Sequence, residues 1–505
     1  MAWFSRKPKH EVSSTPEATG ESQAAQGDNQ AAHPYADDAL KNLAGDELNR
    51  RRLAQTMARV LTNISGQSES AVVALVGQWG SGKSTLLDAI EAELRAGASW
   101  QIAHYNPWSF STLDAAVIGF FSELSGAVPE DTLQKDRRAI IGEWAAKVAP
   151  IGAIGGLVGV DASNGIESVA RIIAGDQSPE KLRERAAQQL SSLNAPILMV
   201  LDDLDRLEPK ELLLTFKLIR LLGRLPNVFY LLAYDEETLE AVLQRTDLVG
   251  QAQGRARDYL EKMVQIRLDI PPLLDHDKGI MVDSGLNKLL VRHGIELNED
   301  VTSRLQAGWA ACLSHYLSQP RTIKKLLGQV DALWPEVAGE VDFADFFFTT
   351  FIRTFERSVF DLVVANRSEL LRHHSLSYDS PKESHQETWS RWTAAIDAAG
   401  AKRPQDIAAL LAEMFLPLRS AKENMSYGSA WMTDVERRRG IGASDFFDRY
   451  TQLGVPVQDI SDAQLTRAIQ ELASGAKGDD LEAIERRMDT DAGFIGRRLY
   501  QYDEI

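Results

Sequence analysis

The sequence predicts an α/β fold: a parallel sheet covered by helices on both faces, followed by a mainly helical C-terminal region. Up to about residue 275, short apolar runs alternate with amphipathic helical patterns. This alternation is typical of strands that are buried on both faces of a parallel sheet. After Pro271 and Pro272 the strand signals fade, and helical patterns continue to the end of the chain.

The elements of the predicted sheet region follow one another in a regular order. A first helix over residues 46–64 places Leu53, Met57 and Leu61 near helical spacing and carries a basic cluster at residues 50–52. Two further amphipathic helices follow the first and third apolar runs. The helices are expected at 84–95 and 211–222, and the strands at 71–76, 100–105, 196–201 and 228–233.

Composition limits the classes of protein to which the chain can belong. Its 505 residues, 44% of them hydrophobic and 25% charged, predict two to four domains with a sizeable core and exclude bulk disorder. The single cysteine, Cys312, excludes a disulfide scaffold and is typical of a reducing compartment. A net charge of −17 argues against a nucleic-acid-coating surface, and there is no strong nucleic-acid signal elsewhere.

Composition shifts also predict the domain boundaries. The first residues are rich in Ser, Thr, Glu, Gln and Ala with little to bury, which indicates a disordered tail. A polar stretch later in the chain indicates a loop. The expected organisation is a tail over 1–38, a core over 39–275 with a helical insert at about 112–190, a helical region over 276–371, and a mainly helical region over 372–505 with a polar loop at 372–389.

The strongest chemical signal lies between the first strand and the helix 84–95. There the sequence fits G-x-x-x-x-G-K-[ST] at every fixed position. The glycines allow backbone N–H groups to turn toward an anion at the helix N-terminus, the lysine reaches the β- and γ-phosphates, and the following hydroxyl is a ligand for Mg²⁺. The predicted nucleotide-binding residues are Gly77, Gln78, Trp79, Gly80, Ser81, Gly82, Lys83, Ser84 and Thr85.

Acidic residues stand at the ends of two later strands. Asp202 and Asp203 follow the run 196–201, at the carboxyl end of a strand, where ligands bind in open α/β sheets. Asp202 is the expected metal ligand together with Ser84, and Asp203 is the expected base or water-orienting group. Asp235 follows the run 228–233 and either senses the γ-phosphate or caps the helix that begins near Glu236.

Together these motifs resemble the KAP family of P-loop NTPases. The resemblance covers most of residues 40–465. It rests on the phosphate loop with its tryptophan, an Asn-Pro-Trp signature, the metal-binding strand end, the segment that closes the core, a Pro-Arg motif and a C-terminal segment. The corresponding residues are 77–85, 106–108, 201–206, 232–235 and 259–271, then 319–325, 447–450 and 459–462.

The family resemblance implies a P-loop NTPase core of the additional-strand ATPase type, with a catalytic acid on the strand beside the phosphate loop. It also implies ATP and Mg²⁺ as cofactors. Arg321 either resembles a sensor that contacts the γ-phosphate from a helical lid or is an ordinary arginine at the start of a helix. Family members often carry transmembrane helices in the insert, but the apolar segment at 148–160 is too short to span a bilayer. We therefore expect a cytoplasmic protein, at most peripheral to the inner membrane.

The function that these residues predict is an Mg²⁺-dependent ATPase that acts as a nucleotide-driven conformational switch. Bacterial relatives in the family are linked to phage exclusion, which implies a role in anti-phage defence. Protein partners or self-association are expected, and Arg220, Arg255 and Arg257 are all candidates for an arginine finger supplied to a second subunit. The alternative is a non-hydrolysing, nucleotide-bound scaffold. Arg206 is expected to form a local salt bridge with the acids.

Overall fold

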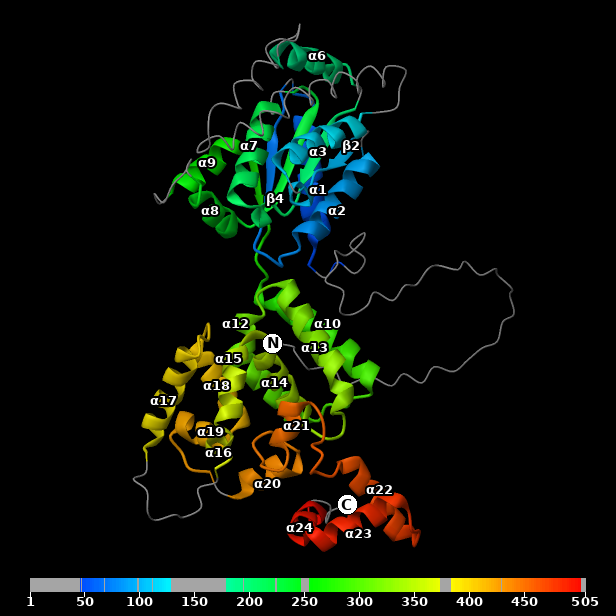
Figure 1. Cartoon of the computed structure of the whole chain (residues 1–505), viewed down its shortest axis with the longest axis vertical. Coiled ribbons are helices and arrows are strands. Elements are labelled where there is room, and N and C mark those ends of the chain that lie inside the picture. The colour runs from blue at the N-terminus through cyan, green and yellow to red at the C-terminus, as the bar shows by residue number, and fades with distance from the viewer. Residues whose placement is uncertain are drawn as a thin grey trace, which may run out of the picture. The chain divides into compact units, whose positions relative to one another are not determined.

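In a computed structural model the protein forms two compact units, divided between Pro272 and Leu273 (Figure 1). The expected tail over 1–38 and the apolar segment 148–160 lie outside the described residues. The described residues are 46, 48–67, 69–97, 100–110, 112–128, 179–193, 195–222, 225–246, 254–372, 383–427 and 429–500.

The first unit is built on a five-stranded sheet in which all the pairings are parallel. The strand order is β2-β3-β4-β1-β5. β4 is the additional strand that stands between the phosphate-loop strand β1 and the acid-bearing strand β3, so the predicted fold class is confirmed. The strands are β1 (Val72–Val76), β2 (Gln101–His104), β3 (Ile197–Leu201), β4 (Val228–Tyr234) and β5 (Ile266–Asp269).

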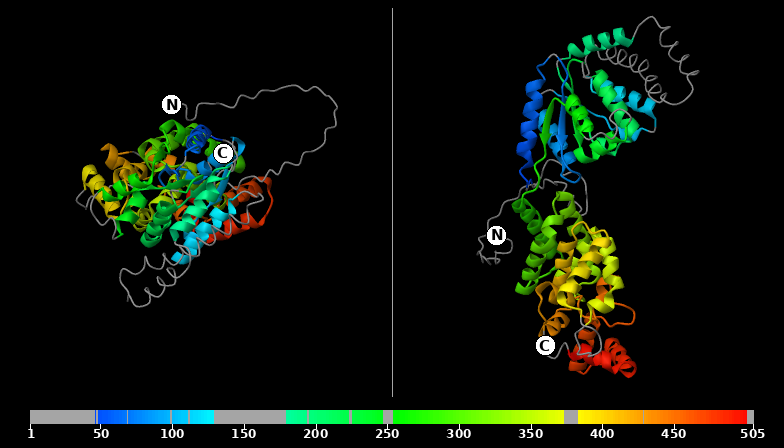
Figure 2. Two further views of the ribbon diagram at one scale, coloured as in Figure 1. Left: turned by 90° about the horizontal axis from the view of Figure 1, so that it is seen from above. Right: turned by 90° about the vertical axis from the view of Figure 1, so that its left-hand side faces the viewer.

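Helices cover both faces of this sheet, because successive residues of each strand point to opposite sides. Along β1, Val73 and Leu75 pack toward one face, with α1 and α2, while Val72, Ala74 and Val76 pack toward the other. Figure 2 shows α1 on one side of the strands and the later helices on the other. The helices are α1 (Arg50–Ile64) and α2 (Lys83–Gly97) on the first face, and α3 (Leu113–Gly126), α6 (Pro179–Ser191), α7 (Pro209–Leu222), α8 (Glu236–Gln244) and α9 (Arg255–Met263) on the second.

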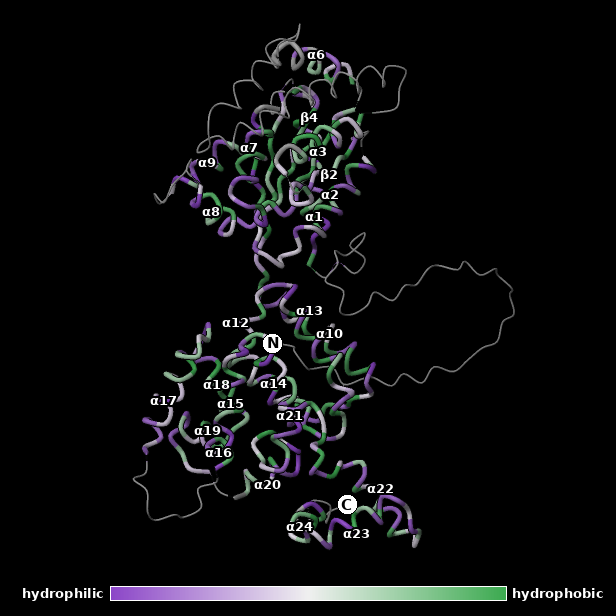
Figure 3. The backbone as a smooth tube through the Cα atoms, in the orientation of Figure 1, coloured by the Kyte–Doolittle hydropathy of each residue, from purple (hydrophilic) through white to green (hydrophobic). Residues whose placement is uncertain are grey.

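Burial on both faces explains why β1, β3 and β4 read as continuous apolar runs, whereas β2 lies at an edge of the sheet and has one buried residue. All seven residues of β4 are buried, and hydrophobic colouring marks the centre of this unit (Figure 3). β5 did not produce such a run, and the sequence did not predict it. As an edge strand it alternates between partly buried and exposed residues, with Arg267 and Asp269 on its exposed side. The structure also places β4 between β1 and β3. The strand that ends before Asp202 and Asp203 is therefore not directly beside the phosphate-loop strand, whereas β4, which ends before Asp235, is.

The described residues of the second unit form helices joined by loops and contain no strand. α14 is buried along its first ten residues, from Phe343 to Ile352, and packs against α11, α13 and α15. The helices are α10 (Asp275–His293), α11 (Glu299–Gly308), α12 (Ser314–Tyr316), α13 (Pro320–Leu333), α14 (Phe343–Phe355), α15 (Arg357–Ala365), α16 (Arg367–Leu370), α17 (His385–Ala398), α18 (Pro404–Met414), α19 (Leu416–Glu423), α20 (Ser429–Arg437), α21 (Phe447–Gln452), α22 (Asp462–Ser474), α23 (Asp479–Thr490) and α24 (Ala492–Tyr500).

The polar loop expected at 372–389 is shorter than the sequence suggested. α17 begins at His385, so the last five residues of that stretch are helical, while residues 373–382 lie outside the described part. A capping box starts the helix: Ser384 Oγ accepts from the Glu387 N–H at 3.2 Å, and the Glu387 carboxylate accepts from the Ser384 N–H at 2.8 Å. Ser-x-x-Glu was the signal in the sequence for this helix start.

Buried charges join the last helices to the rest of the second unit. The Arg449 side chain is fully buried, and its guanidinium donates to Glu340 and Asp459, each at 2.7 Å. Arg498 of α24 pairs with Asp462 at the start of α22. The apolar cluster of the last three helices is separate from the larger cores, and the Arg498 pair lies within these helices. The pairs Arg449–Asp459 and Arg439–Asp462 connect this segment to the preceding part of the unit.

Replacing Arg449 by Met should therefore destabilise the protein strongly. The change leaves Glu340 and Asp459 buried without their cation, which typically costs about 3–5 kcal/mol of unfolding free energy. The matched control is Arg467→Met, which removes an exposed ion pair to Asp480 and should change stability little. Urea unfolding followed by circular dichroism measures both. Equal small effects in the two variants would contradict a structural role for Arg449.

Candidate functional site

The loop between β1 and α2 has a backbone that requires glycine at three places. Gly80 and Gly82 have φ values of 85° and 92°, in the left-handed region. A Cβ on Gly77 would lie 2.7 Å from the Ser81 hydroxyl and 3.0 Å from the Ile270 side chain, which follows β5. The loop is therefore both tightly turned and tightly packed, as a cradle of backbone N–H groups must be.

Lys83 and Ser81 give this loop its capacity for phosphate. The Lys83 side chain is 8% exposed, and its Nζ donates to the Gly77 carbonyl at 3.0 Å, across the base of the loop. Ser81 Oγ is buried and has no hydrogen-bond partner among the described residues. A cation, an unused hydroxyl and the N-terminus of α2 converge on one loop, and these groups fit a bound phosphate chain.

The predicted metal ligands are brought together by the sheet. Ser84 Oγ donates to Asp202 Oδ2 at 2.8 Å, although the two residues are 118 positions apart in the chain. Oxygen ligands of this kind suit Mg²⁺, which keeps several waters and binds few protein groups. The described ranges contain no group of three or more His, Cys, Asp or Glu that could hold a metal ion.

Asp203 follows Asp202 in a backbone conformation that turns the chain away from the strand. Its φ is 57°, and its N–H donates to Asp202 Oδ1 at 2.8 Å. Burial raises the pKa of Asp203, and the Asp202 charge adds to this shift, while the Arg206 guanidinium opposes it. Arg206 pairs with Asp203 at 3.0 Å, so the local salt bridge expected from the sequence is confirmed.

Asp235 stands at the end of β4 and contacts the phosphate loop. Its Oδ2 accepts from the Trp79 N–H at 2.7 Å, and its Oδ1 accepts from the Thr238 N–H at 3.4 Å, which caps α8. The structure therefore shows the helix-capping role of Asp235, one of the two roles that the sequence left open. Sensing of the γ-phosphate by Asp235 stays a prediction.

The remaining predicted residues have the following places. Gln78 lies in the loop, Thr85 lies in the first turn of α2, and the Trp79 side chain is 63% exposed. Arg321 lies in the first turn of α13 in the second unit, and its action on nucleotide stays a prediction. Among the arginine-finger candidates, Arg220 is on α7, while Arg255 and Arg257 are on α9, all with exposed side chains.

Two contributors were not singled out from the sequence. Asp205 Oδ1 accepts from the Asp235 N–H at 3.4 Å and thereby joins the ends of β3 and β4. Its place in the Leu-Asp-Asp-Leu-Asp-Arg stretch was the available signal. Arg267 of β5 forms a bidentate pair with Glu236, one bond of which measures 2.9 Å, and no local pattern indicates a contact between residues 31 positions apart.

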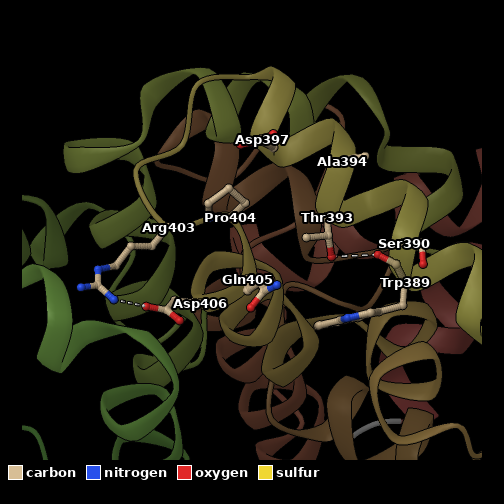
Figure 4. A pocket seen from close by; sticks show the side chains of 9 residues that line it. All are labelled: Trp389, Ser390, Thr393, Ala394, Asp397, Arg403, Pro404, Gln405 and Asp406. Carbon is tan, nitrogen blue, oxygen red and sulfur yellow. Dashed lines mark hydrogen bonds and ion pairs between the residues drawn. The ribbon is translucent and has the colours of Figure 1, made fainter.

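A surface cavity of about 650 Å³ in the second unit contains none of these residues (Figure 4). It lies between α17 and the start of α18, and its Asp406 is engaged by Arg403 and His315. The cavity is lined by Trp389, Ser390, Thr393, Ala394, Asp397, Arg403, Pro404, Gln405 and Asp406.

Comparison with known proteins identifies the family. Residues 50–337, more than half of the chain, match the model of the KAP family P-loop domain. The chain belongs to the KAP family. As a KAP P-loop protein it carries a nucleotide-binding domain, and the residues that form the phosphate loop and the acid pair fall within the matched range.

A curated relative and two solved structures give further comparisons. The chain is 24% identical over 354 residues to the phage T7 exclusion protein of Escherichia coli (strain K12), a match that covers 64% of this chain and about half (47%) of the relative. The ORC2 protein of Aeropyrum pernix, in ADPNP and ADP complexes, is 13% identical, with 84% and 90% of the two chains covered and a TM-score of 0.35. CDC6P from Pyrobaculum aerophilum is 12% identical, with 83% of this chain and 97% of that chain covered and a TM-score of 0.35. These TM-scores carry no argument about function.

Across the residues that the structure describes, no helix combines the length and apolar character needed to cross a bilayer.

Replacing Gly82 by Ala should weaken nucleotide binding by about tenfold or more. An L-residue at a φ of 92° costs roughly 1–2 kcal/mol, and the loop relieves this strain by leaving its phosphate-receiving shape. The control is Gly126→Ala at the end of α3, where an added Cβ meets nothing within 4 Å and φ is ordinary. Titration with a fluorescent ADP analogue measures both, and equal affinities would contradict the role of the turn.

Proposed function

We propose that this protein is an Mg²⁺-dependent ATPase whose cycle of binding and hydrolysis works as a conformational switch. The observation that carries the proposal is the hydrogen bond between Ser84 Oγ and Asp202 Oδ2, at 2.8 Å, with Asp203 next in the chain. That contact joins the phosphate loop to the acid pair. Binding of phosphate and activation of water therefore belong to one site.

Each residue has a distinct role in this proposal. The loop N–H groups and Lys83 bind the phosphates, while Ser84 and Asp202 hold Mg²⁺. The ion, when bound, neutralises charge that develops on the phosphate oxygens. Asp203 accepts the proton of the attacking water or orients that water. Its raised pKa makes it a better proton acceptor than an ordinary exposed aspartate.

The nucleotide is proposed to be ATP. The sequence lacks the Asn-Lys-x-Asp pattern that GTP-specific proteins use for guanine. Arg321 is proposed to read the γ-phosphate from the helical lid, and protein partners or self-association are proposed to couple the cycle to its target.

A second candidate is a non-hydrolysing scaffold that binds nucleotide for its structure alone. The intact acid pair favours the ATPase, because a scaffold has no need of a partly buried carboxylate with a raised pKa beside the Mg²⁺ ligand. The two candidates differ in turnover, so a measurement of hydrolysis separates them.

The biological setting that we propose is anti-phage defence in bacteria. The relative named phage T7 exclusion protein supports this, although the chain spans about half of its length. The cytoplasmic location expected from the sequence, at most peripheral to the inner membrane, is part of the proposal. Plating of phage on cells that produce the wild-type chain or its Lys83→Ala variant tests it: equal plaque numbers on both would oppose a nucleotide-dependent defence role.

Replacing Asp203 by Ala should lower ATP turnover by about 10²–10⁴-fold while ATP affinity stays unchanged, because the base is lost and the phosphate cradle is kept. Lys83→Ala should weaken both. Steady-state phosphate release in Mg²⁺, with EDTA as the metal-free control, gives turnover, and calorimetry gives affinity. Tight binding without turnover in the wild-type chain would favour the scaffold instead.

Turnover should also depend on pH through Asp203. The carboxylate must be ionised to accept a proton, and burial raises its pKa, so activity should be lost as the pH falls through a value above that of an ordinary aspartate. Arg206→Ala removes a charge that lowers this pKa and should move the loss to higher pH, while Arg206→Lys should stay close to wild type. A pH profile of kcat that is the same in all three would show that Asp203 is not the titrating base.

A further inference from the structure

Asp235 occupies a position from which its carboxylate and its backbone N–H together contact three parts of the first unit. The residue is 7% exposed and follows β4 directly. Its carboxylate accepts from the Trp79 N–H in the phosphate loop and from the Thr238 N–H in α8, at 2.7 and 3.4 Å. Its own N–H donates to Asp205 Oδ1 at 3.4 Å, beyond the end of β3. The ends of β1, β3 and β4 are thus joined at one residue.

The hydrogen bond to the Trp79 N–H lies next to the two glycines of the loop that have positive φ. Trp79 immediately precedes Gly80, which has positive φ, and Gly82 follows two residues later. A glycine-rich segment loses more conformational freedom on ordering than any other, so its shape depends on fixed contacts. A buried hydrogen bond to a charged group contributes more than an ordinary one. The Asp235 carboxylate therefore fixes the first half of the loop, while Lys83 fixes Gly77 through its bond to the carbonyl.

Asp235 is itself held from the opposite side of β1. Arg267 of β5 pairs with Glu236, the residue after Asp235, and also with Asp269 at 2.7 Å. β5 and β4 flank β1 in the sheet, so the segment that carries Asp235 is anchored on both sides of the phosphate-loop strand. Because these contacts fix the position of Asp235, its hydrogen bond to the Trp79 N–H also fixes the position of the loop.

We propose that Asp235 is a positioning residue, which holds the phosphate loop ready for nucleotide through the Trp79 N–H. This rests on the proposed function and differs from sensing of the γ-phosphate. A sensor acts only when a γ-phosphate is present, so its loss lowers turnover and leaves ADP binding intact. A positioning residue acts on the loop itself, and its loss weakens ADP and ATP binding together.

The variants are Asp235→Ala, which removes the acceptor, and Asp235→Asn, which keeps an acceptor oxygen without the charge. Thr112→Ala is the matched control, because Thr112 caps α3 in the same unit by accepting from the Ala115 N–H at 3.2 Å and has no contact with the loop. Circular dichroism verifies that each variant folds. The readouts are ADP and ATP affinity by calorimetry and hydrogen exchange at the Trp79 amide in the nucleotide-free protein.

Asp235→Ala should weaken ADP and ATP by a similar factor of about tenfold and speed exchange at Trp79, since its amide loses a charged acceptor. Asp235→Asn should recover most of the affinity, and Thr112→Ala should match wild type. Unchanged ADP affinity with reduced ATP turnover in Asp235→Ala would overturn the proposal in favour of a sensor. A wild-type chain that binds neither nucleotide would overturn the proposed function, while exchange at Trp79 would still decide whether Asp235 holds the loop.

Discussion

The parallel register of β3, β4 and β1 is the constraint on which the candidate site depends. Val76 pairs with Tyr234 and Leu201 pairs with Leu232, so these strands deliver their following residues to one edge of the sheet. A slip of two residues would move a strand end by about 6.6 Å. No hydrogen bond between Ser84 and Asp202, or between Trp79 and Asp235, survives such a shift. The apolar cores exclude a slip of one residue, because it would turn every side chain of a strand toward the other cluster.

Charged side chains form the candidate site in the first unit and buried ion pairs between helices in the second. In the first unit, charges gather at the carboxyl edge of the sheet, where Lys83, Asp202, Asp203 and Asp235 face a loop that is suited to phosphate. In the second unit, Arg304 and Arg449 are buried against carboxylates, and Arg304 contacts Asp342 at 2.8 Å. Such pairs carry a desolvation cost, so they add specificity to the packing of particular helices more than stability.

The sequence predicted much of the fold for a simple reason. Strands buried on both faces leave an uninterrupted apolar run, and β1, β3 and β4 each left one. β2 was also predicted, although Gln101 and His104 stand at its two ends. β5 alternates exposed charges with apolar residues and resembles a loop or a helix terminus when it is read alone. The start of α17 was also not predicted, although its capping box is present in the sequence, because the polar composition around it was interpreted as a loop.

By itself the sequence determined the chemistry of the site: the phosphate loop, its lysine and hydroxyl, and an acid pair at a strand end. These follow from local patterns, since backbone conformation and helix or strand period are set by neighbouring residues. Only the tertiary structure decided that β4 separates β1 from β3, that Ser84 meets Asp202, and that Asp235 binds the Trp79 N–H. Contacts between residues more than a hundred positions apart depend on strand order and register, which the packing of the whole unit sets.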